Sequence, residues 1–357
     1  MLNNTDFPNI IKIGNKTLSL NDPTFFIADI GANFDQNLNK AKQLALAAKE
    51  AGADVVKFQT FKSEKIVSGP SFSKMTLKGI HGKWQKPINE VYREAEFPHS
   101  WHKELMNYCR EIGVMFSSSP YDFEAVDLLD ELGVDFFKIG SGDITWHEML
   151  EYIAKKNKPM ILSTGDSTLA EVDEAVSVIE KTGNKNLILL QCITNYPAKI
   201  ESANINVLKT YQTAYNILTG YSDHTPGDIV ILGSIALGGR VVEKHFTLNK
   251  KDAGPDHPHS MEPAEFRQMV DRARILESAL GSTRKQVVDE EFETVIVQRR
   301  SLHTTRDLKA GETIAVSDLI ELRPAIGILP KHKYLATGKK IKNDLNKNEA
   351  LTWNNIE

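Results

Sequence analysis

The sequence predicts an α/β fold, a (β/α)8 or TIM barrel followed by a small C-terminal domain. Eight short apolar runs alternate with stretches of helical periodicity between roughly residues 25 and 247. Such continuous apolar strands indicate a parallel sheet whose faces are covered by helices. The span also suits a closed barrel, which usually takes about 250 residues. An open doubly wound sheet is the alternative, but no G-x-G-x-x-G motif follows the first run.

The predicted elements alternate along the chain. The strands are residues 25–31, 55–61, 114–121, 135–142, 159–165, 187–193, 215–223 and 240–248. The helices include residues 38–53, 100–113, 122–133, 146–157 and 168–183. A long polar insertion follows the second strand. The first helix shows the periodicity most clearly, since its apolar face comprises Ala41, Leu44, Ala45, Ala48 and Ala51.

The length of the chain suits one large domain and a minor one. We expect the barrel domain at residues 1–280 and the C-terminal domain at residues 299–357. Residues 281–298 between them are charged and poor in apolar side chains, which is typical of a linker. The C-terminal domain is short and rich in Lys and Asn, so we expect a partner barrel to supply the packing that it lacks.

Composition and charge exclude several classes of protein. The formal net charge of −4 gives no reason to expect a nucleic-acid partner. No run approaches the ~18 apolar residues of a membrane span, and the first residues lack the pattern of a secretion signal. Cys109 and Cys192 lie in apolar contexts and are expected to be buried thiols in a reducing compartment. We therefore expect a cytoplasmic protein.

The C-terminal ends of the predicted strands are polar, and in a barrel these ends form the catalytic face. They carry Asp29, Asn33, Lys57, Gln59, Ser117 to Ser119, Lys138, Ser141, Asp143, Ser163, Thr164, Thr194 to Tyr196, Ser222 to His224 and Glu243 to His245. A buried lysine needs a counter-charge. A single buried lysine would be part of a structural ion pair as often as part of a binding site. Lys57 and Lys138 together with the serines, however, favour a phosphate or carboxylate site. Gly140 and Gly142 would let backbone N–H groups approach the same anion.

Two histidines end neighbouring strands. A lone histidine at His224 or His245 would more often be a hydrogen-bonded core residue. Side by side on an anion-binding face, the two favour a shared divalent metal with room for water and substrate. The histidines His257 and His259 give a weaker signal, and a loop without a role explains them equally well.

Several motifs of the barrel region resemble the sialic acid (nonulosonic acid) synthase family. They are "IADIGANFDQNLNKAKQLALAAKEAGADVVKFQTF", "FKIGSGD", "ILSTG", "YSDHT", "EKHFTL" and "GPDHPHSMEPAEF". The tail, with "RRSLHTTRDLKAGETIAVSDLIELRPAIGILP", is similar to the antifreeze-like (SAF) domain of that family. The resemblance implies condensation of phosphoenolpyruvate with an open-chain N-acyl amino hexose, release of phosphate by C–O cleavage, and a nine-carbon keto acid product.

The resemblance also implies roles for individual residues. The predicted metal ligands, for Mn²⁺ or Mg²⁺, are His224 and His245. Phosphoenolpyruvate would be held by Lys57, Ser119, Lys138, Ser141, Ser163, Thr194 and Ser222. The sugar would be faced by Asp29, Gln59, Asp143, Tyr196, Asp256 and Arg323, the last from the partner subunit of a domain-swapped homodimer. The predicted catalytic residues are Asp29, Lys57, His224 and His245. Asp29 would transfer a proton or only orient the sugar.

Departures from the family pattern bear on the acceptor sugar. Asp29 and Asp143 stand where the family has Glu, and Phe34 stands where it has His. These changes predict a larger, more apolar pocket for a 6-deoxy diacetamido hexose, and a pseudaminic- or legionaminic-type product. Residues 78–105 look like the pseudaminic branch. The alternative is N-acetylneuraminate synthesis from N-acetylmannosamine.

Two other functional classes deserve comparison. A synthase for a phosphorylated acceptor would need a second basic site. A non-enzymatic ice- or carbohydrate-binding protein would not need the polar strand ends. The tail could also serve only to stabilise the barrel as a cap. In that case Arg323→Ala would leave the affinity for substrate unchanged.

Overall fold

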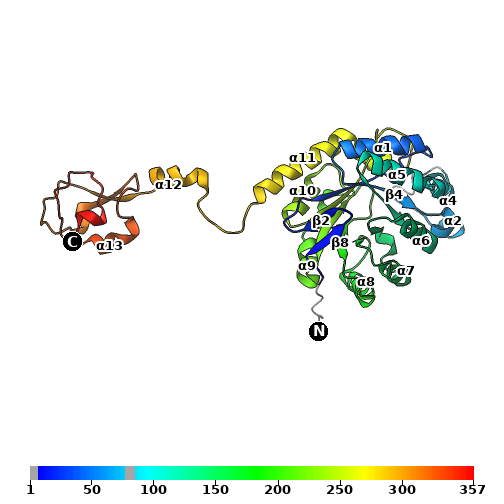
Figure 1. Cartoon of the computed structure of the whole chain (residues 1–357), viewed down its shortest axis with the longest axis horizontal. Coiled ribbons are helices and arrows are strands. Elements are labelled where there is room, and N and C mark those ends of the chain that lie inside the picture. Colours follow the sequence, from blue (N-terminus) through cyan, green and yellow to red (C-terminus); the bar gives the residue numbers. More distant parts are fainter. Residues whose placement is uncertain (1–6, 77–83, 85) are drawn as a thin grey trace. The chain divides into compact units, whose positions relative to one another are not determined.

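The computed structural model describes residues 7–76, 84 and 86–357 (Figure 1). Of the stretch similar to the pseudaminic branch, residues 78–83 and 85 therefore lie outside the described residues. The chain divides into two compact units between Gly281 and Ser282. Each unit is described by itself below.

The first unit contains the predicted barrel, and all eight predicted strands are confirmed. They are β3 (Phe25–Asp29), β4 (Val55–Thr60), β5 (Met115–Pro120), β6 (Phe137–Ile139), β7 (Met160–Ser163), β8 (Leu187–Cys192), β9 (Leu218–Asp223) and β10 (Val241–His245). Hydrogen-bonded neighbours run in the order β5-β4-β3-β10-β9-β8-β7-β6, all parallel. Strands β5 and β6 at the two ends of this order also pack together. The sheet therefore curls into a nearly closed barrel.

Helices cover the outside of the barrel (Figure 1). They are α1 (Leu38–Glu50), α5 (His102–Ile112), α6 (Phe123–Leu132), α7 (His147–Ala154), α8 (Leu169–Lys181), α9 (Val207–Tyr215), α10 (Ile229–Ala236) and α11 (Pro263–Leu280). The predicted apolar face of α1 is buried. Local signals fix where helices begin: the Asp122 side chain accepts a hydrogen bond from Ala125 N, and Thr168 forms a capping box with Glu171.

The inside of the barrel is closed at its N-terminal end by a hairpin that the sequence analysis did not predict. The hairpin consists of β1 (Ile10–Ile13) and β2 (Lys16–Ser19), paired antiparallel. Its buried side chains Ile11, Ile13 and Leu18 join one apolar cluster with inward-facing strand residues such as Ile27 and Val55. One end of the barrel interior is therefore a packed apolar plug, which leaves only the other end for a site.

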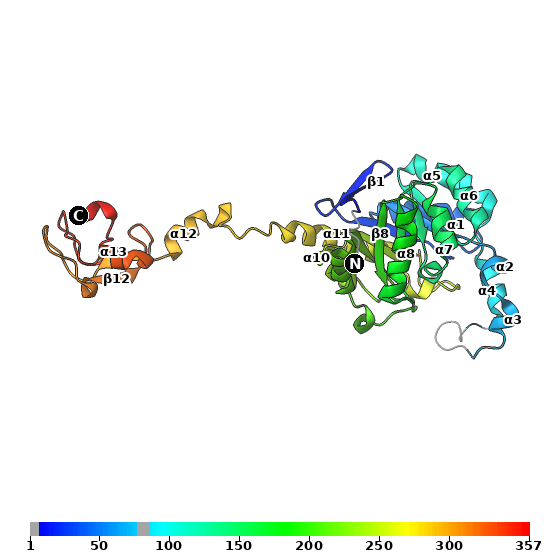
Figure 2. The same cartoon turned by 90° about the horizontal axis from the view of Figure 1, so that it is seen from below.

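The polar insertion after β4 is helical in part. It contains α2 (Ser63–Ile66), α3 (Gly69–Phe72) and α4 (Ile88–Ala95). Ser63 ties α2 to α4, because its hydroxyl donates to Asn89 O at 2.8 Å and its N–H donates to Glu96 Oε1 at 2.7 Å. Figure 2 shows this insertion and the β1–β2 hairpin on opposite sides of the barrel. The insertion thus lies at the polar, C-terminal end of the strands.

The second unit has a core of its own. It comprises α12 (Phe292–Gln298), β11 (Ser301–Thr304), β12 (Leu319–Leu322) and α13 (Lys333–Ala336), with β11 and β12 antiparallel. Ten buried apolar residues form its cluster, among them Leu302, Ile314 and Leu351. These apolar residues are scattered in the sequence and meet only in the fold, and the expected docking on a partner barrel stays a prediction. Helix α12 lies in the predicted linker. Within the described residues, every helix is too short or too polar to span a lipid bilayer.

Candidate active site

Strand alternation brings the predicted site residues into the barrel. Side chains two residues apart on a strand share a face. Ile27 belongs to the apolar plug, so Asp29 also points inward, and Val55 places Lys57 and Gln59 in the same way. The same alternation along the other strands turns further side chains inward, among them Lys138, Ser163, Ser222, Glu243 and His245. The site thus lies directly on top of the plug.

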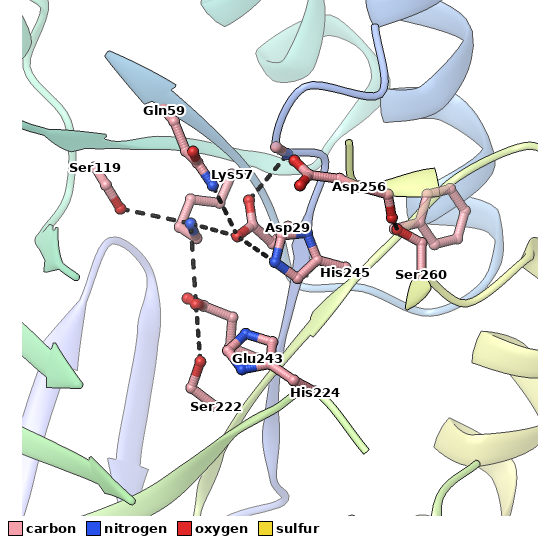
Figure 3. A network of polar contacts seen from close by, with 12 residues as sticks. Asp29, Lys57, Gln59, Ser119, Ser222, His224, Glu243, His245, Asp256 and Ser260 are labelled. Carbon is pink, nitrogen blue, oxygen red and sulfur yellow. Dashed lines mark hydrogen bonds and ion pairs between the residues drawn. The ribbon is translucent and has the colours of Figure 1, made fainter. Parts of the chain in front are cut away.

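The centre of the site is a chain of two lysines and two carboxylates, and Figure 3 shows three of its members, Asp29, Lys57 and Glu243. Lys57 Nζ lies 2.8 Å from Asp29 Oδ2 and 3.9 Å from Glu243 Oε1. Lys138 Nζ lies 3.5 Å from the same Glu243 oxygen. All four side chains are at most 6% exposed. Each buried lysine was predicted to need a counter-charge. Within the chain, the carboxylates of Asp29 and Glu243 supply it.

The two lysines differ in their electrostatic surroundings. Burial by itself would lower the pKa of Lys57, but the carboxylates of Asp29 and Glu243 outweigh it, and its pKa lies above the ordinary value. Burial lowers the pKa of Lys138, and Glu243 offsets only part of that effect. An arriving anion would raise the pKa of Lys138 again, so an anion and the charged form of this lysine stabilise each other.

Hydroxyl groups surround the lysines. Ser163 Oγ lies 2.7 Å from Lys138 Nζ, and Ser119 Oγ lies 3.4 Å from Lys57 Nζ. Ser222 Oγ donates to Glu243 Oε1 at 3.2 Å, and Ser141 Oγ accepts from Gly165 N at 2.9 Å. The Thr194 hydroxyl is buried without a hydrogen-bond partner among the described residues. The structure therefore brings together all of the predicted phosphoenolpyruvate residues along one cavity.

The two predicted metal ligands lie close to each other. The rings of His224 and His245 are 5.5 Å apart between centroids, and His245 Nε2 lies 3.6 Å from Asp29 Oδ2. His224 Nδ1 lies 2.9 Å from Ile193 O, so the tautomer that donates there leaves Nε2 free to accept. The ring of Tyr196 packs against both, with its centroid 4.1 Å from that of His224 and 5.9 Å from that of His245.

The donor atoms of this region fit a divalent ion such as Mn²⁺. His245 Nδ1 is buried without a hydrogen-bond partner among the described residues. Burial also lowers the pKa of His245 well below its ordinary value, so the ring is neutral at pH 7. A neutral imidazole next to carboxylates is a donor set that first-row divalent ions accept.

The carboxylates predicted to face the sugar have raised pKa values. Burial raises the pKa of Asp143 to about 6, and its Oδ2 atom has no hydrogen-bond partner among the described residues. Burial also raises the pKa of Asp256 to about 6, although a hydrogen bond from Ala32 N to Asp256 Oδ2, at 2.8 Å, opposes this effect. Gln59 Nε2 lies 3.5 Å from Asp29 Oδ2.

A second cavity adjoins the lysine site and has a mixed lining. Its polar side is formed by Gln59, Tyr196, His245, Asp256 and His259. Its apolar side comes from the segment that follows β4, and comprises Phe61, Ile66, Trp84, Val91, Tyr92 and Ala95. Among the described residues that line this cavity, none is Lys or Arg.

One of the residues predicted to line the pocket lies elsewhere in the barrel unit. The prediction that Phe34 lines the pocket was wrong. Phe34 is 1% exposed and packs edge-on against Phe97 at 5.2 Å, in an aromatic cluster with Phe58 and Trp101 behind the strands. Arg323 directly follows β12 in the second unit and is exposed. Its role toward the sugar stays a prediction.

Glu243 and His259 lie in the site, although no role was predicted for either. Glu243 bridges both lysines, and the signal was available, because it stands two residues from Val241 and from His245 on one strand. His259 lines the second cavity with its side chain 2% exposed. Its loop gave no periodicity from which burial could be predicted.

Comparison with known proteins agrees with this geometry. The NeuB family profile matches residues 44–285, and the SAF domain profile matches residues 299–357. The N,N'-diacetyllegionaminic acid synthase of Campylobacter jejuni is 39% identical over 312 residues, which cover 85% of this chain and 92% of that protein. The pseudaminic acid synthase of Helicobacter pylori is 33% identical over 336 residues, 94% of this chain and 98% of that protein.

A solved structure agrees as well. The crystal structure of N-acetylneuraminic acid (sialic acid) synthetase from Leptospira borgpetersenii, in complex with citrate, is 30% identical and has a TM-score of 0.72. The match covers 80% of this chain and 95% of that chain. These matches confirm the predicted family resemblance, and they confirm the predicted barrel fold.

Proposed function

The chain belongs to the NeuB family and is a sugar-acid synthase, and we propose that it condenses phosphoenolpyruvate with a 2,4-diacetamido-2,4,6-trideoxyhexose. Carbon 3 of phosphoenolpyruvate forms the new bond to the aldehyde carbon of the open-chain sugar. A water oxygen adds at carbon 2, and phosphate leaves with the oxygen that joined it to carbon 2. The aldehyde oxygen takes a proton and becomes a hydroxyl group. The product is a nine-carbon acid of the legionaminic or pseudaminic type.

The observation that carries the proposal is the pair of buried lysines at the base of the cavity. Lys57 and Lys138 both lie within 4 Å of Glu243, so their side chains converge on one point. Ser119, Ser163 and Ser222 place hydroxyl groups around that point. Phosphoenolpyruvate carries a phosphate and a carboxylate, which match two lysines and a ring of hydroxyl donors.

A divalent ion, Mn²⁺ or Mg²⁺, would be held by His224 and His245. When bound, it would supply Lewis-acid polarisation of the sugar aldehyde. Tyr196 packs over both imidazole rings and restricts their orientation. Asp29 lies between Lys57 and His245, and is the candidate that holds or moves the proton at the aldehyde oxygen.

The acceptor proposal depends on the mixed cavity next to the lysines. Gln59 and Asp256 offer hydrogen bonds to hydroxyl and amide groups, whereas Ile66, Val91 and Ala95 offer an apolar wall. A 6-deoxy sugar with two acetamido groups has methyl groups for such a wall. A phosphorylated acceptor would need cations, and the described lining contains neither Lys nor Arg. The relatives named for legionaminic and pseudaminic acid support the same class.

N-acetylneuraminate synthesis from N-acetylmannosamine is the second candidate. The likeness to the Leptospira sialic acid synthetase favours it, as does the polar side of the cavity. For either acceptor, we propose a domain-swapped homodimer in which Arg323 of one subunit reaches the N-acyl group bound by the other. Holding two substrates face to face can lower the barrier by about 7–11 kcal/mol, which explains a site rich in binding groups.

Phosphate release tests the acceptor. The purified chain would be assayed with Mn²⁺ and phosphoenolpyruvate, comparing 2,4-diacetamido-2,4,6-trideoxyhexoses with N-acetylmannosamine. A higher kcat/KM for the deoxy sugars supports the first candidate. A higher value for N-acetylmannosamine replaces it by the second.

A further inference from the structure

The loop that follows β10 is held rigidly against the end of that strand. Met261 N donates to His245 O at 2.8 Å, and Thr247 N donates to Met261 O at 2.9 Å. His257 anchors the middle of the loop, since its Nδ1 lies 2.6 Å from Thr247 Oγ1 and its Nε2 lies 3.0 Å from Asp35 Oδ1. Both ring nitrogens of His257 are thus engaged, and its role is to position the loop.

His259, two residues further on, has the opposite character. Its side chain is 2% exposed, yet neither ring nitrogen has a hydrogen-bond partner among the described residues. An unsatisfied buried polar group is destabilising, so such groups are rare in native proteins. His259 Nε2 lies 3.9 Å from Asp256 Oδ1, and its ring centroid lies 4.8 Å from that of His245. The rigid loop therefore holds an unpartnered imidazole inside the site.

Three donor atoms converge at this point. His245, Asp256 and His259 each offer one ligand atom, and these three atoms all lie within 4.8 Å of one another. Ligands bound to one divalent ion at about 2.0–2.3 Å are separated by roughly 3–4.5 Å, so a small adjustment brings all three onto one ion. Asp256 Oδ2 is fixed by Ala32 N, which leaves Oδ1 on the side of His259. The three residues also line the same cavity.

We propose that His259 is a further ligand of the divalent-cation site, binding the ion together with His245 and Asp256. This inference rests on the proposed function, which requires a divalent ion, and it deepens that function by giving the ion two ligands, His259 and Asp256, beyond His224 and His245. An additional imidazole favours Mn²⁺ over Mg²⁺, because Mg²⁺ prefers oxygen ligands. The site therefore binds Mn²⁺ more tightly and more selectively than two histidines alone would.

The other group of possible metal ligands among the described residues serves a different purpose. It consists of Asp35, Asp252 and His257. Lys40 donates to both carboxylates, and His257 Nε2 lies against Asp35. Because its donor atoms are already engaged by the chain, this group stabilises the loop. The group that includes His259 is the one with donor atoms for a cation.

Mn²⁺ binding to the chelator-treated full chain, without substrates, tests the proposal independently of activity. The loss of the electron paramagnetic resonance signal of free Mn²⁺ gives Kd. We expect His259→Gln and His259→Phe each to raise Kd by at least about tenfold, since even residues that only orient metal ligands contribute that much. Pulsed measurements should show one fewer nitrogen coupling in both variants. His147→Gln is the matched control, because His147 is 40% exposed on α7 outside the barrel.

The outcomes separate this inference from the proposed function. Weakened binding in both folded His259 variants, with unchanged binding in the His147 control, supports the inference. Values of Kd within about twofold of the unsubstituted chain in the His259 variants, with binding lost in His245→Gln, overturn it and leave the proposed function intact. If the unsubstituted chain binds no Mn²⁺, both this inference and the cation of the proposed function are overturned.

Discussion

Lys57 Nζ lies 2.8 Å from Asp29 Oδ2, and this buried pair joins the inner faces of strands β4 and β3. Replacing Lys57 by Met leaves the Asp29 carboxylate buried without its main counter-charge. We expect Lys57→Met to lower the free energy of unfolding by about 3–5 kcal/mol, measured by urea denaturation at pH 7. The double variant Lys57→Met/Asp29→Asn should recover part of that loss, because it buries no uncompensated charge.

The exposed pair of Lys155 and Glu151 provides the control for this comparison. Both side chains are about half exposed, and Lys155→Met should change the free energy of unfolding by less than about 1 kcal/mol. A double variant no more stable than Lys57→Met would contradict the interpretation of Lys57 and Asp29 as a coupled pair.

The raised pKa of Asp143 gives stability a pH dependence. Burial raises the pKa from 3.8 to about 6, so the folded protein binds a proton that the unfolded chain releases between these two values. The stabilisation from this proton is fully present below about pH 4 and is lost as the pH rises through 6. We expect Asp143→Asn to be more stable than the unsubstituted chain at pH 8, by an amount that shrinks toward pH 4.

Denaturation of both proteins at several pH values measures this difference. A gap that stays constant from pH 4 to pH 8 would mean that Asp143 has an ordinary pKa in the folded protein.

The apolar wall of the acceptor cavity includes Val91 on α4. Val91→Thr keeps the shape of the side chain and adds a hydroxyl group. We expect the ratio of kcat/KM for a 6-deoxy acceptor to that for its 6-hydroxy counterpart to fall by about tenfold, since a single polar group changes discrimination by about 1–3 kcal/mol. Val178→Thr on α8, which is also partly buried, should leave the ratio unchanged. An unchanged ratio in Val91→Thr would remove this wall from acceptor selection.

Mixed dimers test the proposed exchange of the C-terminal domain. Lys57→Ala and Arg323→Ala would each be expressed alone and then together. In a domain-swapped heterodimer, the Lys57-containing barrel receives the intact Arg323 of the other chain, and this restores one of two sites. Random pairing then gives about a quarter of full activity, from two variants that are nearly inactive alone. If co-expression yields only the sum of the single variants, Arg323 does not act across the dimer.

Much of this fold could be predicted because its pattern is local. Each strand is a short apolar run, and the polar residue that follows it, such as Asp29 or Ser163, marks the catalytic end. The β1–β2 hairpin could not be predicted in the same way, because Ile11, Ile13 and Leu18 gain their partners only when the barrel closes over them.

The site residues show the same division. Lys57 and Lys138 stand out, since a lysine in an apolar strand requires a partner. That Glu243 is a shared partner depends on the register of three strands, which the sequence does not state. Phe34 misled the prediction because it stands where the family has His, whereas its side chain packs into the aromatic core.

The most direct test of the central claim is the fate of the bridging oxygen of phosphoenolpyruvate. The full chain would be incubated with Mn²⁺, a 2,4-diacetamido-2,4,6-trideoxyhexose, and phosphoenolpyruvate that is isotopically labelled at the oxygen between carbon 2 and phosphorus. The account predicts that the label appears in inorganic phosphate, with one phosphate released for each nine-carbon acid formed. No acceptor-dependent phosphate release with any amino sugar, or label retained in the keto acid, would contradict it.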